Sequence, residues 1–240
     1  MLKKIAHITD LHLDESFPFK DKTAARKRFD KVLESIIANG INHVICTGDI
    51  GENEGIPYFF DQLKKMDLSI TLGNHDSFEK ITPYYGSGAD YDSEKIYKSE
   101  IEGHFKFIYL DSATGTVDTR QLEWLKEELK ASTPIVIFMH HPIIGLDLKV
   151  DEIGKLKNRD ALISILEAVP NSITVYCGHY HMESTLVHQN ITQHITPAVA
   201  FQIEKDPSEI KIDTTTTGYR VLRLENGQLS SEVIILNCAD

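Results

Sequence analysis

Short apolar segments alternate with amphipathic segments along the first two-thirds of this 240-residue chain. Short continuous apolar runs predict buried strands, and apolar residues that recur every three or four positions predict helices. Strands alternating with helices form β-α-β units, which require at least one largely parallel sheet. By these criteria we expect strands at 4–9, 43–47, 69–72, 105–110, 134–139 and 173–177, and helices at 23–39, 56–66, 119–130 and 158–168.

The pattern changes after Gly178, where strand-like segments follow one another with only turns between them. Asn226-Gly227 is a strong hairpin turn signal. We therefore expect the last quarter to be antiparallel and to close a second sheet. No Pro- or Ser-rich linker and no internal repeat divides the chain, so we predict one domain over 1–240. Its parallel βα units would run to about residue 181 and its antiparallel strands would occupy 182–237, at 184–188, 191–195, 198–203, 219–224 and 229–236.

The charge balance excludes several functions. The chain has 25 Lys and Arg against 36 Asp and Glu, for a net charge of −11. An acidic protein is expected to bind poorly to long nucleic acids and to anionic membrane surfaces. Three Cys do not build a disulfide framework, and no apolar run approaches the ~18 residues of a transmembrane helix. Since the first residues also lack the apolar region of a signal peptide, we expect a cytoplasmic location.

Five short motifs rich in Asp, Asn and His follow directly after expected strands. Because the carboxyl ends of parallel strands form the ligand crevice of such sheets, we expect these motifs to converge on one point. Gly at a strand end also permits backbone turns that other residues resist. The motifs are Asp10-Leu11-His12, Gly48-Asp49, Gly73-Asn74-His75-Asp76, His140-His141 and Gly178-His179-Tyr180-His181.

The residue types in these motifs are those of a metal site. Carboxylate, amide and imidazole together suit Mn, Fe or Zn, and the lack of a thiolate argues against a structural zinc site. If Asp-x-His and His-x-His are extended, both side chains of each pair point to the same face, and His141 points away from His140. Seven candidate ligands exceed the need of one ion. Two ions ~3.5–4 Å apart, bridged by one carboxylate, would use them all.

This ordered set resembles the pattern of the calcineurin-like metallophosphoesterase superfamily, and every position of that pattern is filled. The resemblance implies an α/β fold, a four-layer αββα sandwich of two mixed β-sheets flanked by helices. It also implies two bound metal ions, Mn²⁺, Fe²⁺/Fe³⁺ or Zn²⁺, which share these ligand types. Carried over by position, the ligands are Asp10, His12 and His181 for a first ion, Asn74, His140 and His179 for a second, and Asp49 as the bridge.

The same resemblance implies hydrolysis of a phosphate ester by attack of a hydroxide that bridges the two ions. His75 would contact the substrate phosphate together with Asn74, and it would donate a proton to the leaving alkoxide. Imidazole suits that role near neutral pH. Glu52, three residues past Asp49, would orient His75, as an acid in this region does in relatives.

Within the superfamily, the chain is most similar to the class III cyclic-nucleotide phosphodiesterases, through segments 196–202 and 217–224. Gly48-Asp49 is not followed by the Arg of the Ser/Thr protein phosphatase branch. We therefore expect a phosphodiesterase that favours a 3′,5′-cyclic nucleotide. The alternatives are a broader phosphodiesterase or phosphomonoesterase, and a metal-binding scaffold or interaction module without activity.

Some features leave alternatives open. The expected partner is a small phosphate ester, and the C-terminal strands are compatible with either a monomer or a homodimer. Residues 84–99 form a polar, Tyr-rich loop that is either functional or merely solvated. His7, His43, His104, His188 and His194 match no motif, so we expect them to be packed or surface histidines.

Overall fold

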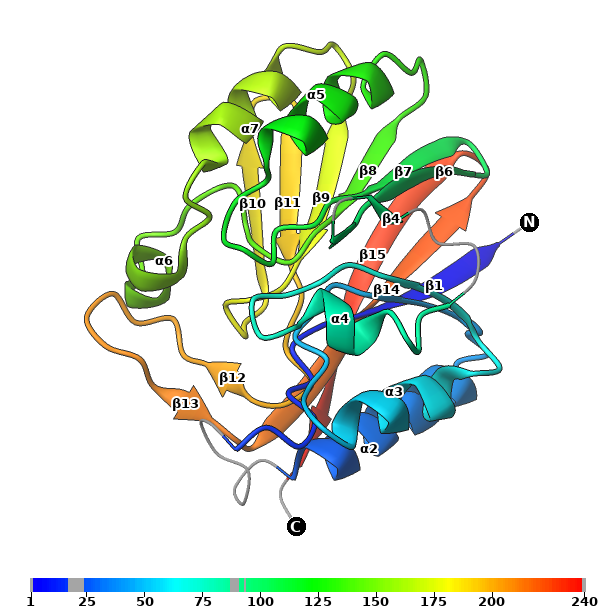
Figure 1. Ribbon diagram of the computed structural model, residues 1–240, viewed down its shortest axis with the longest axis vertical. Helices are drawn as coiled ribbons and strands as arrows, with labels where there is room; N and C mark the ends of the chain where they lie inside the picture. The colour runs from blue at the N-terminus through cyan, green and yellow to red at the C-terminus, as the bar shows by residue number, and fades with distance from the viewer. Residues whose placement is uncertain (1, 17–23, 87–90, 93, 239–240) are drawn as a thin grey trace.

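The computed structural model describes residues 2–16, 24–86, 91–92 and 94–238. Its two main β-sheets cross the centre of the molecule (Figure 1). In the five-stranded sheet, β1, β2 and β3 are parallel, whereas β14 is antiparallel to β1 and β15 to β14. The order of that sheet is β15 (Gln228–Asn237), β14 (Thr216–Glu225), β1 (Lys3–Ile8), β2 (His43–Cys46) and β3 (Asp67–Ile70).

The six-stranded sheet has four parallel strands at its centre and an antiparallel strand at each edge. Its order is β10 (Ser184–His188), β11 (Ile191–Ile195), β9 (Ile173–Cys177), β8 (Ile135–Phe138), β7 (Phe105–Tyr109) and β6 (Lys98–Glu102). Two small antiparallel ladders complete the strands, β12 (Gln202–Ile203) with β13 (Ile212–Asp213), and β4 (Tyr91–Asp92) with β5 (Lys95–Ile96).

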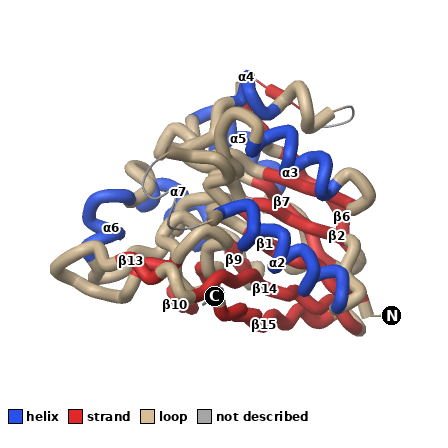
Figure 2. The backbone as a smooth tube through the Cα atoms, turned by 90° about the horizontal axis from the view of Figure 1, so that it is seen from below, coloured by secondary structure: helices blue, strands red, loops and turns tan. Residues whose placement is uncertain are grey.

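Helices cover the outer face of each sheet. Figure 2 shows α2 along the outer side of β1 and β14, where Phe29, Val32 and Ile36 are buried at helical spacing. In Figure 1, α5 and α7 lie over the other sheet. The helices are α2 (Ala25–Ala38), α3 (Gly55–Leu63), α4 (Phe78–Ile81), α5 (Thr119–Glu128), α6 (Lys149–Gly154) and α7 (Arg159–Glu167).

Alternating side chains divide the core into three layers. On β1, Ala6 and Ile8 pack toward the helices, whereas Ile5 packs between the two sheets against residues such as Phe107 and Tyr176. Burial of each large apolar side chain stabilises the fold by roughly 1.5–3 kcal/mol. Helix, sheet, sheet and helix therefore stack in four layers, which confirms the predicted αββα sandwich.

The expectation that the C-terminal strands close a separate second sheet is wrong. They are divided between the two sheets: β14 and β15 extend the five-stranded sheet from β1, and β10 and β11 extend the six-stranded sheet from β9. Moreover, β11 is parallel to β9, with Ile191 opposite Ile173. The physical reason is that β1 and β9 would otherwise present unpaired backbone groups at open edges.

Segment 198–203 is also less regular than expected, because only Gln202–Ile203 forms a strand. Its earlier backbone groups have another task. The N–H groups of Val199 and Ala200 donate to the carbonyls of Thr9 and Asp10, each at 3.0 Å. This segment therefore supports the first motif loop in place of a ladder.

Of the Tyr-rich segment 84–99, residues 87–90 and 93 lie outside the described residues. Its C-terminal end leads into β6, a strand that the apolar pattern did not reveal because Lys98–Glu102 alternates charges with a single Ile. In the described residues, none of the helices has the length and apolar character needed to cross a membrane. The single-domain organisation over 1–240 stays a prediction.

Candidate metal centre

The five motifs lie at the ends of five parallel strands, three in one sheet and two in the other. β1, β2 and β3 lead into the loops that carry Asp10, Asp49 and Asn74, and β8 and β9 lead into His140 and His179. The two edges meet: Oδ1 of Asn74 lies 3.0 Å from Nε2 of His140. The motifs therefore gather at the carboxyl edge of both sheets, where such folds bind ligands.

Three groups of three side chains among the described residues present atoms that could hold one ion; one of them is His12, Glu15 and His75, and the other two comprise six predicted ligands. Within each group the candidate ligand atoms lie within 4.8 Å of one another. The six predicted ligands are all buried or half-buried, which shields their charges from water. The two groups of predicted ligands are Asp10, His12 and His181, the first group, and Asp49, His140 and His179, the second group.

One oxygen of Asp49, a member of the second group, also lies close to the first group. Its Oδ2 is 3.6 Å from Nε2 of His12 and 3.4 Å from Nε2 of His140. Its other oxygen, Oδ1, accepts a hydrogen bond from the backbone N–H of His75 at 2.9 Å. The carboxylate is thus held in an orientation from which Oδ2 faces both groups.

Each of the four imidazoles in these groups has its outer nitrogen beside a hydrogen-bond acceptor. An acceptor at the outer nitrogen fixes the tautomer, because that nitrogen then carries the proton and the inner nitrogen carries the electron pair. The four contacts are His12 Nδ1 with the Glu15 carboxylate at 2.9 Å, His140 Nδ1 with the Thr47 carbonyl at 2.8 Å, His179 Nε2 with the Gly154 carbonyl at 2.7 Å, and His181 Nδ1 with the Phe201 carbonyl at 3.0 Å.

The inner nitrogens then face each other in pairs. Nε2 of His12 lies 3.1 Å from Nε2 of His181, and Nε2 of His140 lies 3.1 Å from Nδ1 of His179. Two electron pairs at this distance repel unless a positive charge lies between or beside them. Neutral imidazoles oriented in this way can bind metal ions, so the residues present fit such binding.

The carboxylates make the centre attractive to cations. Burial alone would raise the pKa of Asp49, but the charge and hydrogen bond of His140 hold it well below its usual value. Burial would lower the pKa of His140, but the negative charge of Asp49 raises it to about 9. The field of these carboxylates, which favours a proton on His140 in the metal-free centre, also favours a divalent cation that would take the place of that proton.

The motif backbones are not extended, contrary to the expectation from side-chain alternation. Asp10, His12, Asp49, His179 and His181 all have left-handed backbone conformations, with φ between 47° and 70°. Such conformations cost non-glycine residues of order 1–3 kcal/mol each, and they persist where the surroundings determine them. Both residues of Asp-x-His and of His-x-His still reach the centre, through tight turns.

Backbone hydrogen bonds between the first two motif loops hold these turns. The N–H of Asp10 donates to the Gly48 carbonyl at 3.0 Å, and the N–H of His12 donates to the Asp49 carbonyl at 2.9 Å. Gly48 itself has φ of +94°, and a Cβ there would collide with the backbone of Gly73. Gly48 therefore fits the expected role of a strand-end glycine in two ways: its backbone conformation favours glycine, and a side chain would have no room there.

His75 lies beside the centre, with 36% of its side chain exposed. Its Nδ1 is 2.9 Å from Oε2 of Glu15. This hydrogen bond raises the pKa of His75 to about 9, against the opposing effect of burial. His75 is therefore poised as a cation that solvent and small solutes can reach.

The acid beside His75 is Glu15, whereas the family resemblance implied Glu52 in that role. Among the hydrogen bonds of the described residues, none joins Glu52 to His75; the backbone N–H of Glu52 donates to the Leu13 carbonyl at 2.8 Å. Sequence reasoning missed Glu15. Its only signal is an acid three residues after His12, which an acidic chain offers at many positions.

His141 points into the same region of the fold and not away from it. Its ring centroid is 4.2 Å from that of His179, and its Nδ1 is 2.9 Å from Oγ of Ser112. Burial, followed by the charge of His179, lowers the pKa of His141 to about 2. His141 is thus a neutral side chain that packs against His179.

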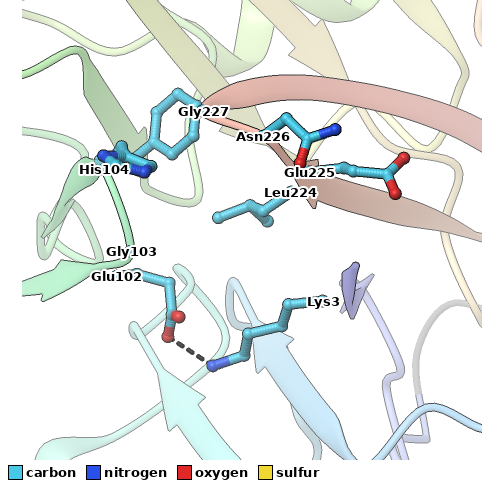
Figure 3. A pocket seen from close by; sticks show the side chains of 9 residues that line it. Lys3, Glu102, Gly103, His104, Leu224, Glu225, Asn226 and Gly227 are labelled. Carbon is cyan, nitrogen blue, oxygen red and sulfur yellow. Dashed lines mark hydrogen bonds and ion pairs between the residues drawn. The ribbon is translucent and has the colours of Figure 1, made fainter. Parts of the chain in front are cut away.

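A separate cavity of about 290 Å³ lies at the other end of the sheets (Figure 3). Lys3 at the start of β1 and Phe105 at the start of β7 line it, and Lys3 forms a salt bridge with Glu102. The motif residues follow the opposite ends of their strands. None of them lines this cavity, so it is distinct from the metal centre.

Comparison with known proteins agrees with this geometry. Residues 3–183 match the family model described as calcineurin-like phosphoesterase. The chain belongs to this family. The match covers the strands that carry all five motifs. The fold and the two groups of candidate ligands support the binding of divalent metal ions in this member of the family.

Relatives and solved structures extend the comparison. The chain is 27% identical to the 3′,5′-cyclic adenosine monophosphate phosphodiesterase CpdA of Vibrio vulnificus, over 96% of this chain and 89% of the relative. It is 25% identical to a probable cyclic nucleotide phosphodiesterase of Fibrobacter succinogenes, over 98% and 94%. Its fold is similar to a dimetal phosphatase from Danio rerio, with a TM-score of 0.66, 14% identity and 99% coverage of both chains.

Proposed function

We propose that this phosphoesterase is a dinuclear-metal phosphodiesterase whose favoured substrate is a 3′,5′-cyclic nucleotide. The observation that carries the proposal is the pairing of inner imidazole nitrogens at 3.1 Å on both sides of Oδ2 of Asp49. That arrangement supports two adjacent cation sites sharing one carboxylate oxygen. The two relatives named for cyclic nucleotides support the substrate class.

The proposed ligand sets follow the two groups of side chains. Asn74 completes the second set, because its Oδ1 lies 3.0 Å from Nε2 of His140 and its side chain is exposed. We assign Asp49 as the bridge. The first ion would be held by Asp10, His12 and His181, and the second by Asn74, His140 and His179.

The chain's own residues would orient the ester and supply the proton that the leaving group needs. Two bound divalent ions would lower the pKa of a coordinated water and neutralise charge on the phosphoryl oxygens. His75 and Asn74 are the exposed members of the motif cluster, which supports their assignment as the residues that would contact the phosphate. The His75 imidazolium, whose pKa is raised to about 9 by Glu15, would donate its Nε2 proton to the leaving alkoxide.

A substrate panel tests the proposal. Purified protein would be stripped of metal, reloaded with Mn²⁺, Zn²⁺ or Fe²⁺, and assayed with 3′,5′-cyclic nucleotides, 2′,3′-cyclic nucleotides, glycerophosphodiesters, an aryl phosphodiester and phosphomonoesters. We expect metal-dependent hydrolysis of diesters with the highest kcat/KM for a 3′,5′-cyclic nucleotide. Preference for a monoester would favour the phosphomonoesterase alternative. Inactivity toward every ester with both ions bound would favour a metal-binding scaffold.

Three further expectations come from the sequence. The partner would be a small phosphate ester and not a long nucleic acid, in keeping with the net charge of −11. A cytoplasmic location and the alternative of a homodimer stay predictions. Cell fractionation and the solution mass of the protein would test them.

A further inference from the structure

Glu15 is a buried carboxylate that joins two histidines of different motifs. The residue is 5% exposed. Its Oε2 lies 2.9 Å from Nδ1 of His12 and 2.9 Å from Nδ1 of His75. One oxygen atom therefore accepts hydrogen bonds from a candidate metal ligand and from the proposed phosphate contact.

The two imidazoles that meet at this oxygen have a defined relative orientation. The His12 and His75 ring centroids are 4.9 Å apart, and the rings are almost perpendicular at 89°. With both Nδ1 atoms engaged by Glu15, the nitrogens left for chemistry are the two Nε2 atoms. Nε2 of His12 faces His181 in the first ligand group, so the same carboxylate sets His75 relative to that group.

The loop that carries Glu15 is firmly held. Leu13 forms a parallel bridge with Gly51, and its N–H donates to the Ile50 carbonyl at 3.0 Å. A Cβ at Gly51 would collide with the Leu13 carbonyl, so the two loops are in direct backbone contact. Glu15 thus follows directly after a stretch of backbone that is anchored at Leu13.

Hydrogen bonds from the two histidines offset the cost of burying the Glu15 carboxylate. Oε1 of Glu15 is buried and has no hydrogen-bond donor among the described residues. A buried carboxylate without donors is costly, so its ionised form depends on the contacts with His12 and His75. The neighbouring acid Asp14 is already paired with Arg26 and does not compete.

We propose that Glu15 is a positioning residue that ties His75 to the metal centre through a shared hydrogen-bond acceptor, Oε2. The proposal rests on the proposed phosphodiesterase function for its kinetic consequences only. Its structural content is that removal of one carboxylate disturbs two motifs at once: the ligand orientation of His12 and the ring position of His75.

The test is Glu15→Gln, which keeps the shape of the side chain but removes its charge. Partners of this kind typically contribute about 10- to 100-fold to metal affinity or activity. We expect kcat to fall by about that factor at saturating metal, with a small change in KM. Because His75 would protonate the leaving group, the loss should be larger for a phenyl diester than for a 4-nitrophenyl diester.

A double-mutant cycle separates positioning from a merely structural role. If Glu15 acts through His75, then adding Glu15→Gln to His75→Ala should cost much less kcat than Glu15→Gln costs alone. Glu15→Asp, which keeps the charge but shortens the arm, should restore part of the metal affinity. Independent, fully additive losses in the cycle would overturn the proposal.

Two readouts do not need turnover. Titration of the apoprotein with Mn²⁺ should show a weaker first site in Glu15→Gln, and ¹⁵N NMR should show altered His75 ring nitrogens. Unchanged metal affinity and unchanged ring shifts would overturn the proposal even if the enzyme were inactive. Conversely, a wild type that hydrolyses no ester would remove the proposed function and leave these two measurements decisive.

Control variants complete the design. Glu54→Gln alters an exposed acid in the loop after Asp49 and should behave as the wild type in every assay. Glu52→Gln tests the acid that sequence reasoning favoured. If Glu52→Gln reproduces the leaving-group effect and Glu15→Gln does not, Glu52 is the positioning residue and the proposal is wrong. Circular dichroism of each variant verifies that it is folded.

Discussion

Oδ2 of Asp76 accepts a hydrogen bond from the backbone N–H of Asp49 at 2.8 Å. The same oxygen accepts from the N–H of Gly73 at 2.8 Å, and Oδ1 accepts from the N–H of Ile50 at 2.9 Å. The last residue of the Gly-Asn-His-Asp motif therefore fastens the loop after β2 to the loop after β3. Its contribution to the centre is structural: it orients the backbone from which the bridging carboxylate projects.

We expect Asp76→Asn to weaken both the fold and the metal centre. The amide group would place N–H donors against backbone N–H donors, and an unmet hydrogen bond of this kind costs about 1–3 kcal/mol. Urea unfolding of the apoprotein measures the first effect, and metal content after dialysis measures the second. Asp61→Asn is the matched control, because Asp61 is exposed and, among the described residues, forms its ion pair with Lys64 alone on the helix surface. Equal stability of the two variants would contradict this role of Asp76.

Stability should fall in mild acid because of His7. This histidine is buried, with Nε2 2.9 Å from Oγ1 of Thr47 and Nδ1 2.7 Å from Oγ1 of Thr196. Burial, followed by the charge of Arg220, lowers the pKa of His7 to about 3. The unfolded chain binds a proton below its ordinary value of about 6.5, whereas the native protein does not until about pH 3. The stability that His7 contributes is therefore complete above pH ~6.5 and is lost as the pH falls toward 3.

Urea unfolding of the metal-free protein at several pH values measures this effect. Between pH ~6.5 and ~4.5 His7 alone should remove roughly 2–3 kcal/mol. His7→Gln lacks the titrating group, so its stability should depend less on pH over the same interval, whatever its stability at neutral pH. A pH dependence identical to that of the wild type would show that other groups cause the acid sensitivity.

Gly178→Ala should damage the centre without adding charge or polarity. A Cβ at Gly178 would collide with Oγ1 of Thr9 and Oδ2 of Asp10, which lie across the sheet edge from β9. Asp10 would have to move, and its Oδ2 would lose the hydrogen bond from the N–H of His179 at 2.9 Å. We expect a loss of metal affinity, measured by titration of the apoprotein. Gly86→Ala is the control, since a Cβ there would contact nothing within 4 Å among the residues that the structure describes.

The elements of the central sheets could be predicted because their side chains are buried on both faces. Segment 134–139 was expected to be such a strand, and all four residues of β8 are buried. Ile135 and Ile137 pack against the helix layer, and Val136 and Phe138 pack between the sheets. A continuous apolar run is the direct signature of this double burial. The charged edge strand β6 has no such signature and was missed.

The convergence of the motifs was predictable for a different reason. Parallel strands place their carboxyl ends together, so the topology brings Asp10, Asp49 and Asn74 to one edge without further information. What the alternation rule could not provide is the left-handed backbone at Asp10 and His12, because it is imposed by hydrogen bonds from another loop. The role of Glu15 could not be predicted either, because its partners lie in two motifs that come together only in the folded chain.

Asn74→Ala should separate the two proposed metal sites. Asn74 belongs only to the second proposed set, so its removal takes one ligand from that site and none from Asp10, His12 and His181. Loaded with Mn²⁺ and freed of excess metal, the wild type should retain about two equivalents and the variant about one. Asn42→Ala alters an exposed amide far along β2 from the centre and should retain as much metal as the wild type. Elemental analysis of the three proteins decides the matter: a single equivalent in the wild type would contradict a dinuclear centre, and loss of both ions from Asn74→Ala would contradict separable sites.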